Sequence, residues 1–282
     1  MRLLIPLFLS LFIYLPKSWS CSFLPENNMT ISPSEKSDGL TEAQYHQVID
    51  KVAGTYSVIL EKIGKKLTIN RLWEDPRVNA GTTKKGNEVI INLYGGFARH
   101  PMLTEDGYAL VICHELGHHL GGSPKKNLPD PSWPSTEGQA DYYATLKCLR
   151  KVFRKDDNQM AIKEKEIPLL ATDKCSLSFK QDWERALCIR TTLAGISVGN
   201  VMAYRRDTLP DINTPDQKIV EQTVDSHPPT QCRVDTYFQG SICEISSYKS
   251  VSSLDEKTGT CHPLNGHEAG NRPACWFVPT LE

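Results

Sequence analysis

The sequence lacks an excess of charge of either sign. Its 32 Lys and Arg residues are balanced by 33 Asp and Glu residues, and the formal net charge is −1. Proteins that bind nucleic acid usually carry a basic stripe that neutralises phosphates, so the charge balance argues against nucleic acid as a partner. It indicates no other class of partner and no oligomeric state.

Long apolar runs are missing beyond the first twenty residues. The most apolar later stretch, residues 191–204, is interrupted by Gly, Ser and Asn, whereas a helix that spans a bilayer needs roughly 18 uninterrupted apolar residues. We therefore expect no transmembrane helix after residue 20. The chain has no internal repeat, and 282 residues of which 39% are apolar suffice for one sizeable globular domain or two small ones.

Residues 1–20 have the pattern of a secretory signal peptide. Arg2 precedes an apolar stretch over residues 3–15, and the small residues Ser18 and Ser20 stand where a signal peptidase requires them. Cleavage at this site would leave Cys21 as the first residue. We therefore expect an exported protein, located in the periplasm or cell envelope if the source is bacterial and secreted otherwise.

Cys21 itself is open to two interpretations. It is either a lipidated cysteine that tethers the protein to a membrane, as in bacterial lipoproteins, or an ordinary disulfide cysteine. Trp19 weakens the first interpretation, because a small residue is usual there.

All nine cysteines lie at or after residue 21, and an exported chain oxidises most of its thiols. Four bridges form if Cys21 is lipidated; otherwise one thiol is left over, and we expect a buried, free Cys113. The sequence does not determine the pairing. Short separations make two local bridges conceivable, Cys232 with Cys243 and Cys261 with Cys275.

The expected elements are those of an α+β protein. After a Ser- and Pro-rich stretch that predicts a flexible leader over residues 21–40, apolar spacing and capping residues predict helices over residues 41–63, 104–120, 137–154 and 181–206. Short β-branched runs predict strands over residues 67–73 and 88–93. We place one domain over residues 41–235 and an irregular, disulfide-stabilised C-terminal segment over residues 236–282.

The second predicted helix contains the motif His-Glu-Leu-Gly-His at residues 114–118. Residues four apart lie on one face of a helix, so His114 and His118 can bind one zinc ion while Glu115 is directed at a water molecule on that ion. His119 is one position further round the helix, and we expect it to point away from the metal. This spacing is typical of zinc peptidases.

A catalytic zinc takes three protein ligands and keeps one open position. A third histidine six residues after His118 is excluded, because residue 124 is Pro. Glu137, at the start of the next predicted helix, is the candidate for the third ligand, and Asp141 lies one turn further on the same face, where it can orient a ligand histidine. The alternative for Glu137 is a carboxylate that merely interacts with the helix macrodipole.

In this order the motifs resemble the gluzincin peptidases of the HtpX, BepA and CAAX-prenyl-protease type. The resemblance covers roughly residues 70–235 and rests on the HExxH motif, the Glu-Gly-Gln-Ala-Asp string at residues 137–141, Val-Asn-Ala at residues 78–80, and Ser-His-Pro-Pro at residues 226–229 followed by Arg233. It implies a zincin-like fold, in which the HExxH helix packs against a small, mostly antiparallel sheet. The cysteine-rich tail and the lack of transmembrane helices depart from the family's best-known members.

The resemblance also implies roles for residues outside the motif. The strand over residues 88–93 would be an edge strand that pairs with an extended peptide, which makes Asn92 a candidate for substrate contact. His227 would stabilise the tetrahedral intermediate, and Arg233 would support the loop around His227 through a carboxylate.

We therefore expect an exported zinc endopeptidase with one Zn²⁺ per chain, Glu115 as general base, and a peptide or unfolded protein as substrate. One alternative is a zinc-containing but catalytically silent binding or chaperone-like protein. Another is a structural protein in which the HExxH motif is accidental and disulfides define the fold.

Overall fold

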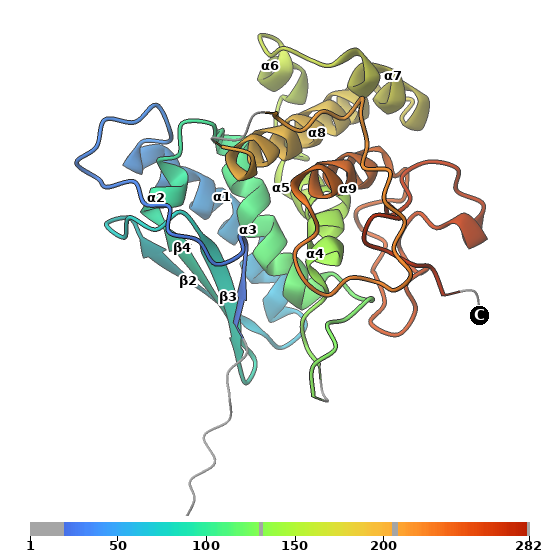
Figure 1. Cartoon of the computed structure of the whole chain (residues 1–282), viewed down its shortest axis with the longest axis horizontal. Helices are drawn as coiled ribbons and strands as arrows, with labels where there is room; N and C mark the ends of the chain where they lie inside the picture. Colours follow the sequence, from blue (N-terminus) through green and yellow to red (C-terminus); the bar gives the residue numbers. More distant parts are fainter. Residues whose placement is uncertain (1–19, 130–131, 205–207, 281–282) are drawn as a thin grey trace, which may run out of the picture.

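A computed structural model describes residues 20–129, 132–204 and 208–280. Within these residues the fold is α+β: one small mixed sheet lies at one side of the molecule, and helices pack against one of its faces (Figure 1). The predicted signal peptide lies outside the described residues except for Ser20, and so does the predicted end of the fourth helix at residue 206.

The sheet has the strand order β1-β3-β4-β2, with bounds Ser20–Ser22, Ala80–Lys85, Glu88–Tyr94 and Lys66–Leu72 respectively. Strands β3 and β4 form an antiparallel hairpin, β1 is antiparallel to β3, and β2 is parallel to β4. Gly86 makes the hairpin turn with φ of 59°, a conformation that favours glycine. The two expected strands are thus found as β2 and β4.

Strand β4 occupies the interior of the sheet. Both of its backbone edges are paired, one with β3 and the other with β2. The expectation that residues 88–93 form an edge strand able to pair with a peptide is therefore wrong. Periodicity in the sequence reports which face of a strand is buried, and it carries no information on strand order.

One face of the sheet forms the main hydrophobic core. Val89, Ile91 and Leu93 alternate along β4 and are buried in a core that they share with helix α1, Glu42–Glu61, and with residues 103–116. Thr41 caps that helix in a reciprocal hydrogen-bonded box with Gln44, as the sequence predicts.

Helix α3 (Glu105–Leu120) runs through the centre of the molecule, with the sheet on one side and helices α4 (Glu137–Tyr143) and α8 (Asp182–Met202) on others (Figure 1). A Cβ atom on Gly117 would lie 2.8 Å from the carbonyl oxygen of Ala140, so only glycine lets the α3 and α4 backbones approach this closely. The predicted helix over residues 137–154 is continuous but contains a π-helical turn, η1 (Ala144–Cys148), before α5 (Leu149–Val152).

Several helices were not expected from the sequence, namely α2 (Gly95–Ala98), α6 (Asn158–Ile162), α7 (Leu169–Ser178) and α9 (Thr230–Ile242). Helix α9 packs against α8 and α4, and the predicted domain boundary at residue 235 falls inside it. The C-terminal segment is joined to these helices by Trp276, a buried residue whose indole N–H donates to Thr236. Of the helices described, none is long and apolar enough to cross a membrane.

Residues 21–40 do not form the flexible leader that their composition predicts. The side chains of Phe23, Leu24 and Leu40 belong to the main core. The backbone of Phe23 donates to Ala80, and that of Leu40 donates to Ala98. A few apolar residues are sufficient to anchor this polar segment. The average composition of the segment does not reveal them.

Four disulfide bonds occur in the described residues: Cys113–Cys148, Cys175–Cys188, Cys232–Cys275 and Cys243–Cys261. The expectation of a free Cys113 is wrong, and so are both local pairs suggested by short separation. Two bridges join neighbouring helices, Cys113 on α3 with Cys148 on η1 and Cys175 on α7 with Cys188 on α8, and the other two tie the C-terminal segment to α9 and its end. Cys21 is the free cysteine, and it is buried. This number of disulfides is typical of an oxidising compartment outside the cytosol.

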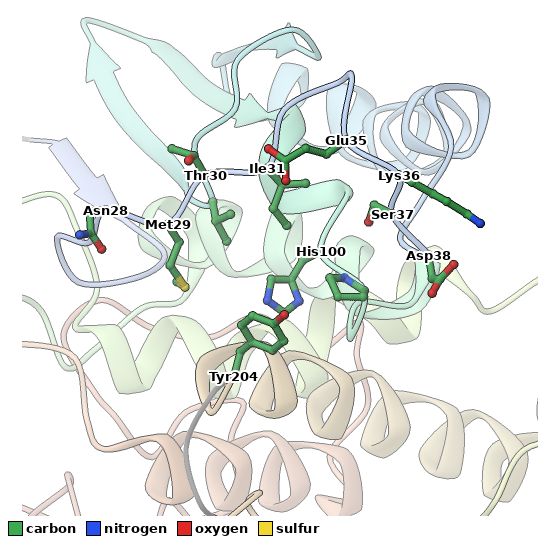
Figure 2. Close-up of a pocket in the computed structure, with 12 residues that line it drawn as sticks. Asn28, Met29, Thr30, Ile31, Glu35, Lys36, Ser37, Asp38, His100 and Tyr204 are labelled. Carbon is green, nitrogen blue, oxygen red and sulfur yellow. The ribbon is translucent and has the colours of Figure 1, made fainter.

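A cavity of about 720 Å³ lies between residues 28–38 and the end of α8 (Figure 2). His100 and Tyr204 face each other in it, with ring centroids 4.5 Å apart in an edge-on arrangement. His100 is buried, and burial lowers the pKa of its imidazole to about 4.

Removing the Cys113–Cys148 bridge should destabilise the fold. The bridge closes a sequence separation of 35 residues, and the entropy of such a loop corresponds to about 3–4 kcal/mol. We expect a Cys113→Ala, Cys148→Ala double variant to lose about this much free energy of unfolding in a urea titration. An unchanged midpoint and slope would show that the bridge contributes nothing to stability.

His100 should make stability depend on pH. In the unfolded chain the imidazole takes up a proton near pH 6.5, whereas in the folded protein it stays neutral down to about pH 4. The unfolded state binds more protons between these values, so acidification favours unfolding. Between about pH 7 and about pH 4.5 we expect the parent to lose about 2 kcal/mol more than His100→Asn, which keeps an acceptor for the Met102 N–H. Equal losses of stability in the parent and in His100→Asn would contradict the low pKa of His100.

Candidate metal centre

Three buried side chains converge where α3 meets α4. His114 and His118 come from successive turns of α3, and Glu137 is the first residue of α4. The Oε2 atom of Glu137 lies 3.2 Å from His114 Nε2 and 3.5 Å from His118 Nε2. Two atoms bound to one tetrahedral zinc at about 2.0–2.1 Å lie about 3.3–3.4 Å apart, so the spacing fits a shared ion.

The same three atoms have no hydrogen-bond partner among the described residues. The other ring nitrogens do: His114 Nδ1 lies 2.7 Å from Asp141 Oδ1, and His118 Nδ1 lies 2.9 Å from the carbonyl oxygen of Ser135. Because a carboxylate and a carbonyl can only accept, each Nδ1 carries a proton, so that in a neutral ring the Nε2 lone pair would be the one available to a metal ion. Buried polar atoms are rarely left unsatisfied, and a metal ion would satisfy all three.

Lys126 contacts the remaining oxygen of Glu137. Its ammonium group donates to Oε1, which leaves Oε2 to face the histidines. Burial raises the pKa of Glu137, but the two adjacent imidazoles outweigh this effect and hold it well below the usual value. The carboxylate is therefore ionised and presents a single oxygen to the cluster.

Glu115 is the buried carboxyl group without a partner. Neither of its oxygens forms a hydrogen bond within the described part of the chain, and burial raises its pKa to about 7. A buried, unpaired carboxyl group opposes folding, and such groups gather at functional sites. A group with this pKa can both accept and release a proton near neutral pH.

Asp141 is held by residues from α3 and α9. Its Oδ1 accepts from His114 Nδ1, from Arg233 Nη2 at 2.8 Å and from the Tyr237 hydroxyl at 2.7 Å, while Oδ2 accepts from Arg233 Nε at 2.7 Å. Burial raises the pKa of Asp141, but Arg233 and His114 lower it to about 2. Asp141 thus remains charged and orients the His114 ring.

His227 reaches the centre from the loop before α9. Its Nε2 lies 3.4 Å from Glu137 Oε2 and 2.7 Å from the carbonyl oxygen of Ser22, to which it donates. Burial lowers the pKa of this imidazole. A neutral ring with its proton on Nε2 therefore lies beside the cluster and already contacts a peptide carbonyl.

Cys21 also lies at the centre. A ligand atom from each of Cys21, His118 and Glu137 falls within 4.8 Å of the others, so this group could hold a metal ion. Asp216, Cys232 and Cys275 form a second group of this kind, but its two cysteines are joined in a disulfide and offer no thiolate.

Other expected site residues lie elsewhere. Asn92 accepts a hydrogen bond from Asn70 on the neighbouring strand and does not reach the metal centre. His119 points away from the cluster, as expected: its Nε2 lies 2.8 Å from Thr82 Oγ1, and its ring stacks on Trp133.

Sequence reasoning missed Cys21, Lys126 and Tyr237. The odd cysteine count pointed to one free thiol, but the expectation named Cys113 instead of Cys21. Tyr237 follows Arg233 by four residues, the spacing of one helical face, yet the Pro-, Gly- and Cys-containing surroundings were interpreted as irregular structure. Nothing in the loop sequence distinguishes Lys126 from Lys125.

Replacing Asp141 by Asn should affect both stability and metal binding. The change leaves the buried Arg233 charge without its partner, which costs about 3–5 kcal/mol, and the loss of an outer-shell carboxylate typically lowers metal affinity about 10–100-fold. Tyr237→Phe is the control, since it removes one hydrogen bond to Asp141 worth about 1 kcal/mol and no charge. Urea unfolding and zinc competition with a chromophoric chelator would measure both effects. Equal behaviour of the two variants would contradict the ion pair's role.

Comparison with known proteins adds no relative to these observations. No protein-family model matches the chain, and neither a curated protein nor a solved structure matches it significantly. The function is therefore argued from the geometry of the centre.

Proposed function

We propose that the protein is a zinc-dependent endopeptidase whose metal ligands are His114, His118 and Glu137. The observation that carries the proposal is the set of buried, unpartnered atoms, two imidazole Nε2 and one carboxylate oxygen, in which each nitrogen lies 3.2–3.5 Å from the oxygen, the spacing of two ligands to one ion. Two nitrogens and one oxygen form a donor set that suits zinc and leaves a fourth position for chemistry. The identity of the metal, the activity and export to an oxidising compartment are all part of this proposal.

A bound zinc ion supplies Lewis acidity toward a peptide carbonyl and lowers the pKa of a water molecule to about 7. Glu115 takes the proton of the attacking water, for which its raised pKa is suited, and then delivers that proton to the leaving amine. His227 donates its Nε2–H to the carbonyl oxygen as negative charge develops there. Asp141 keeps the Nε2 of His114 unprotonated and aligned.

A binding protein that uses zinc only as a scaffold is less consistent with these groups. A purely structural zinc site needs no carboxyl group kept unpaired in the interior. Glu115 has no structural partner in the described residues and so has no evident role in such a protein.

The test compares the parent with Glu115→Gln and Glu137→Gln. We expect one zinc per chain in the parent and in Glu115→Gln, with cleavage of unfolded casein reduced about 10²–10⁴-fold in the latter. Replacing an outer-shell partner typically lowers metal affinity about 10–100-fold, and Glu137→Gln, which removes a ligand, should lower zinc affinity by more than that. Each assay is repeated with Cys21→Ala added, because that thiol lies beside the centre.

Two outcomes would overturn the proposal. Absence of zinc from the parent would remove the metal centre. Stoichiometric zinc with equal casein cleavage by the parent and Glu115→Gln, in both Cys21 backgrounds, would show that Glu115 is not the base.

A further inference from the structure

We propose that residues 21–24 occupy the peptide-binding groove of this same enzyme, with the Cys21 thiolate as the fourth metal ligand, so that the chain is latent. The inference rests on the proposed function and extends it to regulation. Three independent sets of contacts carry it: strand pairing, the partners of two backbone carbonyls, and the position of the Cys21 sulfur.

The first set is the pairing of β1 with the edge of β3. Ser20, Cys21 and Ser22 lie opposite Thr83, Thr82 and Gly81, and both strands contact α3. The pairing continues past the strand, because Phe23 N donates to Ala80 O at 3.0 Å. Asn79 then brackets the Leu24 backbone: its side chain accepts from Leu24 N at 2.9 Å and donates to Leu24 O at 3.2 Å.

These are the contacts that an extended peptide makes when it adds to a sheet edge. Strand β4 cannot provide such an edge, because it pairs with β3 on one side and with β2 on the other. Strand β3 pairs with β4 on one side only, and its other side is the edge on which β1 lies. That side runs alongside the HExxH helix, and residues 20–24 cover it. A substrate strand in the same place would displace them.

The second set involves two successive backbone carbonyls, those of Ser22 and Phe23. Ser22 O accepts the Nε2 proton of His227, the group that we assign to the oxyanion, at 2.7 Å. Phe23 O accepts from Arg233 Nη1 at 2.8 Å, and the Phe23 ring packs edge-on against His114. The carbonyl of the Ser22–Phe23 bond is thus engaged by His227, the residue that the mechanism would direct at a substrate carbonyl.

The third set is the position of the thiol. Burial alternates along β1, and the Cys21 side chain points inward to within 4.8 Å of the ligand atoms of His118 and Glu137. Thiolate is among the strongest protein ligands for zinc. On ligation the thiol proton passes to solvent, and the sulfur takes the position of the water molecule that hydrolysis requires; withdrawal of the strand reverses the exchange.

This placement agrees with neither of the two interpretations of Cys21, a lipidated cysteine or a disulfide cysteine. A lipid on the sulfur would have to fit inside a buried cluster, because Cys21 is only 4% exposed. A disulfide would need a partner, and the eight other cysteines are paired with one another. A free thiol directed at the metal centre is consistent with both facts.

The experiment uses the purified protein with Cys21 and all later residues retained, loaded with Co²⁺. Cobalt bound by a thiolate gives a strong near-ultraviolet charge-transfer band, which the parent should show and Cys21→Ala should lack at equal cobalt content. Ser22→Ala is the matched control on the same strand: it keeps the backbone pairing and the thiol, and should keep the band. The zinc forms are assayed in parallel on casein, where Cys21→Ala should be faster than the parent by at least about tenfold, a change equivalent to about 1.4 kcal/mol.

The outcomes separate the two proposals. Bound cobalt without a charge-transfer band in the parent would overturn Cys21 as a ligand while leaving the metal centre intact. A band in the parent with no gain in casein cleavage by Cys21→Ala would overturn latency. Failure of every variant to bind cobalt would instead remove the metal centre, and with it the proposed function.

Discussion

The buried carboxylate of Asp141 is the interaction on which the arrangement of the centre depends. It lies on α4 and binds His114 of α3 together with Arg233 and Tyr237 of α9. Taking a carboxylate and a guanidinium out of water costs several kcal/mol per ion, and only near-complete hydrogen bonding offsets that cost. Here the two Arg233 nitrogens and two further donors satisfy both carboxylate oxygens. Three helices are thereby held in one relative position.

Close backbone packing and covalent linkage reinforce the same arrangement. Gly117 lets α4 approach α3 at Ala140, which brings Glu137 to the histidines. The Cys113–Cys148 bridge ties the residue before His114 to the π-helical turn that continues α4. The centre is thus built on rigid elements, and the polar atoms at its middle remain without hydrogen-bond partners because the surrounding packing fixes their positions.

The sequence predicted those parts that depend on local periodicity. Apolar spacing located α1, α3, α8 and the strands β2 and β4, and the HExxH spacing placed His114 and His118 on one face. Helix α9 was missed although Val234, Phe238 and Ile242 are buried at helical spacing. The Pro, Gly, Ser and Cys residues around it suggested irregular structure, and several of its buried residues are polar, among them Arg233, Thr236 and Ser241. Arg233 is buried against Asp141, and Thr236 is buried beside Trp276 of the C-terminal segment. These partners are distant in sequence, so a local pattern does not reveal them.

Features that depend on contacts distant in sequence could not be predicted. Strand β4 lies in the interior of the sheet because β2 pairs with it in parallel. Strand β2 is not part of the β3–β4 hairpin, so no local turn signal in the sequence indicates this pairing. Disulfide pairing depends on such contacts, and Cys232 pairs with Cys275, 43 residues away, and not with the nearer Cys243. The composition of residues 21–40 suggested a flexible leader. An average composition hides the few residues that enter the core, mainly Phe23 and Leu24.

An ordinary structural reason for β1 also exists, because exposed sheet edges promote aggregation and proteins cover them. Such a cover requires only backbone hydrogen bonds to β3. It does not require the Ser22 carbonyl to face His227, the Phe23 carbonyl to face Arg233, or the inward side chain of the strand to be a cysteine beside two candidate ligands. Edge protection accounts for the pairing of β1 alone, whereas occupation of a peptide groove accounts for the pairing and the three side-chain contacts together.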